Sequence, residues 1–156
     1  MASVAQILHG KSDQTVLTIA ADATVFVAVR LMAERNIGAL PVISEGSVVG
    51  IITERNYARR VVLAGRSSKD TTVAEIMDTQ ACEVHPGHSR EACMALVTEQ
   101  RVRHLVVTEA GRLVGLLSIG DLVKATLDEQ RFVIEQLEQY IAGERGIHAP
   151  GDGGTA

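Results

Sequence analysis

Aromatic residues are scarce in this sequence: they make up 3% of its 156 residues, and tryptophan is absent. A surface that binds single-stranded nucleic acid by stacking bases on aromatic rings is therefore not expected. Lysine and arginine form no long run, and the formal net charge is −4. Because non-specific binding to DNA or to an anionic membrane needs clustered positive charge, neither nucleic acid nor a membrane is an expected partner.

Cysteine and long apolar runs are also scarce. The two cysteines, Cys82 and Cys93, are too few for a disulfide framework. No stretch approaches the roughly 18 apolar residues of a membrane span. The first residues show no apolar core behind basic residues, so no signal peptide is expected. These absences favour a cytoplasmic protein.

What the sequence does contain is an internal repeat. Shifted by 65 positions, residues 24–58 match residues 89–123 without a gap. A shorter echo relates residues 4–8 to residues 73–77 at a shift of 69. Because 69 exceeds 65 by four, the first copy has four additional residues near Gly10–Gln14. Only two copies exist, which indicates a pseudo-twofold pair and not a solenoid.

Both copies predict the same order of elements. Thr24 and Ser89 are good N-caps for helices, and each helix is followed by a hairpin with a turn at Gly46 or Gly111. A second helix is expected to start at Thr53 or Ser118. The predicted strands are 16–19, 39–43 and 47–52 in the first copy and 82–84, 104–108 and 112–117 in the second, with helices at 25–34 and 90–99.

The fold class that follows is α/β (α+β). Two β-α-β-β-α repeats, related by a pseudo-twofold axis, are expected to pack sheet to sheet, because neither half could bury its sheet alone. The expected segments are the first repeat at 1–66, the second at 67–127, a C-terminal helix at 128–142 and a disordered tail at 143–156.

The C-terminal helix carries an apolar seam. Leu127, Ile134 and Ile141 are seven residues apart, and Leu137 lies between them. This spacing is typical of coiled-coil a and d positions. Two interpretations remain open: the helix packs on its own domain, or it forms a dimer contact.

One short motif occurs in both repeats at the start of the second helix. It reads Gly50-Ile-Ile-Thr53-Glu-Arg-Asn56 in the first copy and Gly115-Leu-Leu-Ser118-Ile-Gly-Asp121 in the second. A helix start offers free N–H groups to a polar ligand, and an aspartate can accept hydrogen bonds from two neighbouring hydroxyls. The same pair, Ser118 and Asp121, also fits a capping box that binds nothing. Both interpretations are open from the residues alone.

The duplicated motif resembles the cystathionine-β-synthase (CBS) domain family, whose nucleotide-binding copies carry Gly, two apolar residues, Thr or Ser, two variable residues and Asp. The resemblance extends from Val4 to Leu127. It implies a cleft between the repeats in which the aspartate holds ribose hydroxyls, the first strand meets adenine, and basic residues meet phosphates. The implied site residues are Gly115, Ser118, Ile119, Asp121, Val84, His85, Arg103 and His104 in the second copy and Thr18, Ile19, Ala39, Thr53, Arg55 and Asn56 in the first.

The first copy departs from the family pattern because Asn56 stands where aspartate is expected. Asparagine keeps one acceptor but loses the charge, so ribose hydroxyls would be held less well. Arg55, beside it, is available for a phosphate. The sequence therefore predicts two clefts of unequal affinity, of which the weaker would gain from Asn56→Asp.

No catalytic set or metal site is expected. Cys82, His85 and His88 have a spacing that could suggest a metal, but a turn at His85–His88 explains them better. Ser118, His104 and Asp121 fit a binding cleft better than a triad. The resemblance implies a stand-alone regulatory module that forms a homodimer and binds AMP, ADP, ATP or NAD(H). It implies no required cofactor, and the protein that the module regulates is unknown. The alternatives are a structural interaction module and a small nucleotide-processing enzyme.

Overall fold

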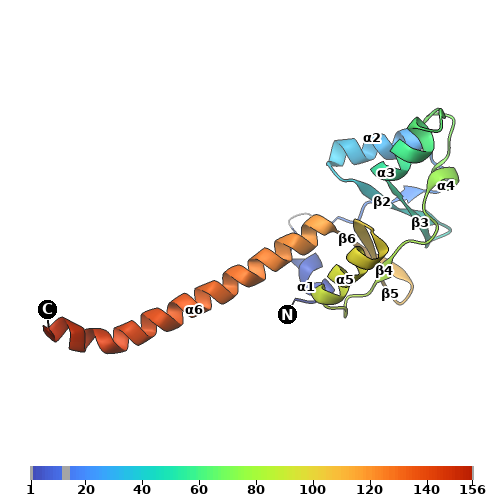
Figure 1. Cartoon of the computed structure of the whole chain (residues 1–156). Helices are drawn as coiled ribbons and strands as arrows, with labels where there is room; N and C mark the ends of the chain where they lie inside the picture. Colours follow the sequence, from blue (N-terminus) through green and yellow to red (C-terminus); the bar gives the residue numbers. More distant parts are fainter. Residues whose placement is uncertain (1, 12–14, 156) are drawn as a thin grey trace.

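The computed structural model describes the backbone of residues 2–11 and 15–155, with side chains to Gly143. A body of two small sheets with flanking helices carries a long helix that extends away from it (Figure 1). The elements are α1 (Val4–His9), β1 (Ile19–Ala20), α2 (Val25–Arg35), β2 (Ala39–Ser44), β3 (Ser47–Thr53), α3 (Glu54–Tyr57), the π-helix η1 (Ala58–Val62), α4 (Val73–Ile76), β4 (Glu83–Val84), α5 (Arg90–Gln100), β5 (His104–Glu109), β6 (Arg112–Ser118) and α6 (Ile119–Thr155).

The two sheets have the same topology. Each contains three strands in the order β1-β2-β3 or β4-β5-β6, with the first pair parallel and the second antiparallel. Equivalent positions have equivalent partners: Ala39 pairs with Thr53, and His104 pairs with Ser118. The predicted repeat architecture is confirmed. The first strand of each sheet has only two paired residues. β4 falls within the predicted range 82–84, whereas β1 shares only Ile19 with the predicted range 16–19.

The predicted helix caps are also present. The Thr24 hydroxyl oxygen accepts a hydrogen bond from the Val27 N–H at 3.3 Å, and the Ser89 hydroxyl oxygen accepts one from the Ala92 N–H at 3.1 Å. Each side chain satisfies a donor that the first helical turn leaves without an intrahelical partner. The caps therefore fix where α2 and α5 begin.

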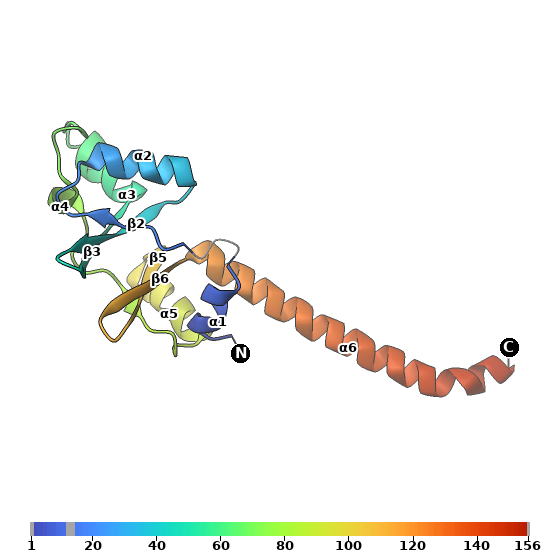
Figure 2. The same cartoon turned by 180° about the vertical axis from the view of Figure 1, so that it is seen from behind.

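The short helices α1 and α4 cross from one repeat to the other. Val4 and Ile7 of α1 belong to the core of the second repeat, and Val73 and Ile76 of α4 belong to the core of the first. Figure 2 shows α1 beside α5 and α4 near β3. The predicted segments 1–66 and 67–127 therefore follow the chain but not the packing, because each segment contributes its first helix to the other core.

The sheets meet face to face, as the repeat pattern predicted. Ala39 of β2, Ile51 of β3 and Val106 of β5 form a buried cluster between them. All three are less than a tenth exposed. Burying apolar side chains from both sheets in one cluster stabilises the pair as a unit.

The last helix differs from the prediction. α6 begins at Ile119, directly after β6, and its backbone is helical to Thr155. The expected boundaries at residues 128 and 143 are absent from it; between Asp121 and Ala142 there is no glycine or proline to end a helix. The side chains after Gly143 lie outside the described part. In the described part of the chain, no helix is both long and apolar enough to cross a membrane.

The apolar seam of α6 does not pack on its own domain. Leu122 is fully buried against the second repeat, whereas Leu127, Ile134, Leu137 and Ile141 are 54%, 54%, 57% and 46% exposed. The first interpretation of the seam is therefore wrong. Figures 1 and 2 both show that α6 leaves the body along most of its length.

Candidate functional site

The second motif copy forms a capping box at the start of α6. The Ser118 N–H donates to Asp121 Oδ2 at 2.8 Å, and the Asp121 N–H donates to the Ser118 hydroxyl oxygen at 3.1 Å. The Ile119 N–H donates to the Arg103 carbonyl oxygen at 2.9 Å. Free N–H groups were expected at this helix start, but these three already have protein partners. Ser118 and Asp121 thus form the capping box, and a ligand role for them would have to be compatible with it.

Lys11 is the partner that the sequence did not reveal. Its ammonium lies 3.0 Å from Asp121 Oδ2 and donates to the Leu116 carbonyl oxygen at 2.9 Å. The Lys11 and Asp121 side chains are 30% and 21% exposed, so the pair is half-buried. Lys11 lies in the four-residue insertion of the first repeat, so the insertion was the available signal that this segment differs from its counterpart in the second repeat.

His104 and Arg103 complete this cluster. His104 is opposite Ser118 in the β5–β6 ladder. Burial lowers the pKa of His104; the Asp121 carboxylate opposes this shift, and the Arg103 and Lys11 charges reinforce it. The imidazole also lies at the repeat boundary, because a Cβ atom added at Gly38 would be 3.7 Å from its ring. The structure therefore brings together four of the predicted residues, Ser118, Asp121, Arg103 and His104, around Lys11.

The first motif copy forms the same capping box, but its Asn56 side chain is buried and hydrogen-bonded at both ends to protein groups. The Thr53 N–H donates to Asn56 Oδ1 at 2.9 Å, and the Asn56 N–H donates to the Thr53 hydroxyl oxygen at 3.1 Å. Asn56 Nδ2 donates to Asp78 Oδ2 at 3.2 Å, and Asn56 is only 5% exposed. Both ends of the amide thus have protein partners. The neighbouring Arg55 is exposed.

The two motif glycines permit different close contacts. A Cβ atom at Gly50 would lie 2.5 Å from the Asp78 carbonyl oxygen, and the Asp78 backbone exchanges two 2.9 Å hydrogen bonds with Ile51. A Cβ atom at Gly115 would instead lie 2.7 Å from the Leu8 side chain. The first copy is therefore closed by backbone and the second by side chains.

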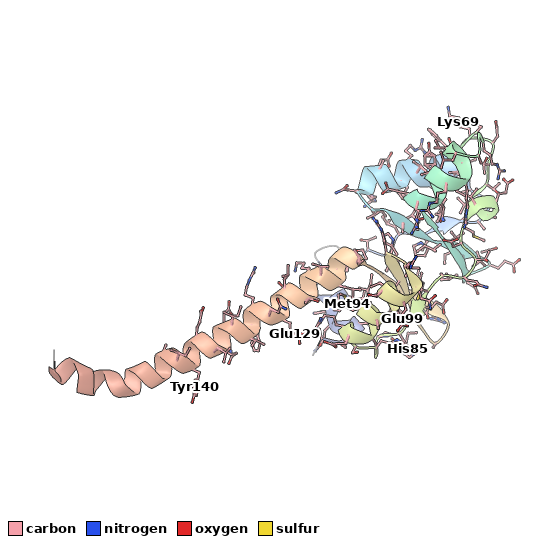
Figure 3. The ribbon with its side chains drawn as sticks, viewed as in Figure 1. Lys69, His85, Met94, Glu99, Glu129 and Tyr140 are labelled. Atoms are coloured by element: carbon pink, nitrogen blue, oxygen red, sulfur yellow. The ribbon has the colours of Figure 1, made fainter. Side chains whose placement is uncertain are left out.

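The side chains of the remaining predicted residues are not part of this cluster, although Ile119 follows Ser118 in the chain and Ala39 lines a hollow that Lys11 also lines. Ile19 and Val84 are buried in their repeat cores, Ile119 and Thr18 are exposed, and Ala39 is in the inter-sheet cluster. His85 lies on the exterior of the second repeat (Figure 3).

The predicted turn at His85 is present. The His85 N–H donates to His88 Nδ1 at 2.9 Å, and the two rings stack with centroids 4.1 Å apart. Among the described residues, no group of three or more His, Cys, Asp or Glu side chains is placed to hold a metal ion.

Two hollows adjoin Lys11. The inter-repeat hollow, of about 430 Å³, lies between the first repeat and β6; it is lined by Ala5, Leu8, His9, Lys11, Thr15, Val16, Leu17, Arg35, Ile37, Ala39, Val114, Gly115 and Leu116. The helix hollow, of about 570 Å³, lies between α1 and α6; it is lined by Ala2, Gln6, Ile7, Gly10, Lys11, Asp121, Lys124, Ala125, Asp128 and Glu129. Lys11 is common to both.

The hollows differ in charge. Lysine and arginine supply the formal charge among the described residues that line the inter-repeat hollow, and apolar residues form most of its wall. The helix hollow has three carboxylates against two lysines. An anionic ligand with a flat apolar part is therefore favoured by the inter-repeat hollow and disfavoured by the larger one.

Comparison with known proteins agrees with the duplicated fold. The mitochondrial CBS domain-containing protein CBSX3 of Arabidopsis thaliana is 40% identical over 140 residues, which cover 86% of this chain and 68% of that protein. A protein with CBS domains from Burkholderia ambifaria MC40-6 has a solved structure that is 50% identical, with a TM-score of 0.79, covering 83% of this chain and 96% of that one.

A third protein shares the fold at lower identity. The structure of CBSX2 in complex with AMP is 23% identical, with a TM-score of 0.70, covering 83% of this chain and 99% of that one. The family model for the CBS domain matches residues 6–63 and 73–128, one match for each repeat. This chain, with its two repeats, belongs to the CBS domain family.

Proposed function

We propose that this CBS domain pair is a regulatory module that binds one adenine nucleotide per chain (AMP, ADP, ATP or NAD(H)) in the inter-repeat hollow. The observation that carries the proposal is the coupling of that hollow to the second motif copy. Lys11 lines the hollow and at the same time pairs with Asp121. A ligand that attracts Lys11 therefore acts directly on the motif aspartate.

The apolar wall suits the base. Val16, Leu17 and Ile37 come from the first repeat, and Val114 and Leu116 come from β6 of the second. A hollow of this volume lies within the range of small-molecule sites, which are mostly apolar with a few polar groups. An adenine ring between these two walls would bury apolar surface from both repeats, so that ligand binding would stabilise their contact.

The cationic side of the hollow suits phosphate. Lys11 and Arg35 both line it, and arginine offers forked donors that match phosphate oxygens. Asp121 lines the helix hollow, which meets the inter-repeat hollow at Lys11. When Lys11 turns to a phosphate, Asp121 Oδ2 loses a cationic partner and becomes available to ribose hydroxyls placed where the two hollows meet. Binding thus exchanges one ion pair for two charge-assisted contacts, while the Ser118 cap on α6 remains in place.

Similarity to CBSX2 supports the ligand class. Its solved structure contains AMP, and the two proteins share the fold over most of both chains. The proposal extends AMP and related adenylates to this chain on the basis of its own hollow and charges.

A thermal-shift panel of adenine and guanine nucleotides tests the proposal. A ligand that binds the native state alone stabilises it by about 2.7 kcal/mol at a hundredfold excess over Kd. The panel should show a concentration-dependent rise in Tm with adenylates. No rise with any adenylate would instead favour a structural interaction module, in which Ser118 and Asp121 only cap α6.

Two matched variants locate the site. Arg35 lines only the inter-repeat hollow, and Lys124 lines only the helix hollow. Arg35→Ala should weaken AMP binding by about tenfold, as expected for a lost hydrogen bond to a charged group, and Lys124→Ala should leave it unchanged. The reverse result would place the ligand in the helix hollow and overturn the assignment.

The proposal assigns no catalytic step to the module. It is a cytoplasmic homodimer that passes the nucleotide signal to a protein partner. Co-purification with and without AMP would identify that partner. Product formation from the best-binding nucleotide would contradict a purely regulatory role.

A further inference from the structure

Beyond Glu129, α6 has left the body of the protein. Arg90 of α5 holds the first turns through hydrogen bonds to Thr126 Oγ1 at 2.9 Å and to Glu129 Oε2 at 3.0 Å. Every described α6 side chain after Glu129 is exposed. Figure 3 shows Tyr140 on this projecting part and Glu129 near the body. The body therefore fixes the direction of the helix and leaves its outer part uncovered.

The projecting part and the turn before it carry a broad apolar stripe, called the α6 stripe below. Its members are 46–67% exposed. At 100° per residue they fall on one side of the helix, whereas Phe132 falls on the other. The α6 stripe consists of Leu127, Val133, Ile134, Leu137, Tyr140 and Ile141. A continuous stripe of this kind marks an interaction surface.

We propose that the α6 stripe pairs with the α6 stripe of a second copy of this chain, with the two helices antiparallel. In this arrangement, a positions of one helix face d positions of the other. Ile134 of each copy then packs on Leu137 of the other, and Ile141 packs beside Gln130. The inference rests on the helix alone and does not depend on nucleotide binding.

The charges beside the stripe select the direction. Arg131 and Glu138 occupy the same flank, one heptad apart. In the antiparallel pair, Arg131 of each copy faces Glu138 of the other, and Val133 faces Tyr140 on the opposite flank. In a parallel pair, Arg131 would face Thr126 of the other copy, and Glu138 would face Val133. Gln130 would also meet Gln130 of the other copy in the seam. Charge complementarity thus favours the antiparallel pair.

The position of the bodies fits the same direction. The seam from Gln130 to Ile141 covers about 18 Å at 1.5 Å per residue. The Gln130 end of the seam adjoins the body of its own chain. In an antiparallel pair, the Ile141 end lies beside the body of the second copy. The two bodies therefore stand at opposite ends of the seam and do not compete for one place.

The first test compares two α6 side chains of similar exposure, Leu137 at 57% and Phe132 at 60%. Leu137→Lys puts a charge into the seam, and Phe132→Ser changes the opposite side. We expect the Leu137 variant to lower the mass measured by light scattering at tens of micromolar, while the Phe132 variant keeps the wild-type mass. Equal masses for wild type and Leu137→Lys would overturn the proposal. Far-ultraviolet circular dichroism checks that both variants remain folded.

The second test uses charge reversal and cross-linking. Arg131→Glu and Glu138→Arg should each weaken self-association, and the double variant should restore it, because each ion pair is then rebuilt in reverse. Gln130→Cys and Ile141→Cys proteins should form a disulfide when mixed under oxidising conditions. A Gln130→Cys protein that cross-links efficiently to itself would indicate a parallel pair. Failure of the double charge reversal to restore self-association would indicate a different occupant of the α6 stripe. Either result overturns the antiparallel assignment.

Discussion

The two motif copies share a capping box but differ in what closes them. At the first copy, the Asp78 backbone pairs with Ile51, and the Asp78 carboxylate accepts from Asn56. At the second copy, the Lys11 ammonium donates a hydrogen bond to the Leu116 carbonyl oxygen and forms an ion pair with the Asp121 carboxylate. A backbone ladder is fixed by the fold, whereas a lysine side chain can rotate to another partner without moving the backbone. The first copy is thus held by backbone contacts, and the second is held by one side chain that our proposal requires to move.

The largest effect should come from Gly50, with Gly115 as its matched comparison. Gly50→Ala places a methyl group against the Asp78 backbone, and Gly115→Ala places one against the flexible end of Leu8. Overpacking of this kind costs about 1–3 kcal/mol. We expect Gly50→Ala to lie at the upper end of that range and Gly115→Ala at the lower end. Urea unfolding measures both, and equal losses would remove the distinction between backbone and side-chain closure.

Asn56→Asp should have the next largest effect, and its sign differs from the sequence prediction. A carboxylate there would lose the amide donor and face Asp78, at a position that is 5% exposed. Arg60, 2.9 Å from Asp78, offsets part of the repulsion. We expect a loss of about 2 kcal/mol in the free energy of unfolding and no gain in AMP affinity. Stronger AMP binding without a loss of stability would restore the prediction of two ligand sites.

The smallest effect should be the pH dependence from His104. Its folded pKa is lowered from the ordinary 6.5, chiefly by burial. The unfolded chain therefore binds a proton more readily, so the stability contributed by neutral His104 is complete above about pH 6.5 and declines as the pH falls from there toward the folded pKa. Asp121, Arg103 and Lys11 are the charges that act on it. His104→Gln should reduce the loss of stability between pH 7 and pH 5.5; an unchanged loss would contradict this origin.

Local patterns predicted the repeated elements well. The gapless match placed both hairpins, and Thr24 and Ser89 identified the starts of α2 and α5. These features depend on neighbouring residues, which periodicity and capping preferences describe directly. The echo between residues 4–8 and 73–77 marked α1 and α4 as equivalent segments, but it could not show which repeat core each one joins. Their exchange between repeats therefore became visible only in the structure.

The candidate site was less accessible to sequence reasoning. Lys11 and Asp121 are 110 positions apart, and no local pattern links them. Asn56 was expected to be a weak ligand residue, but its burial depends on Asp78, which the repeat alignment does not connect with the motif. The roles of the predicted ligand residues stay predictions until binding is measured.

Calorimetric titration of AMP into wild type and Asp121→Asn tests the central claim most directly. Asn56 shows that an asparagine can form this capping box, so the variant should keep its cap on α6 while losing the charge that faces Lys11 and that we propose to hold the ribose. The account predicts one AMP per wild-type chain and about tenfold weaker binding to the variant, the lower end of the effect of a hydrogen bond to a charged group. Two AMP molecules per chain, or equal affinity for wild type and Asp121→Asn, would contradict it.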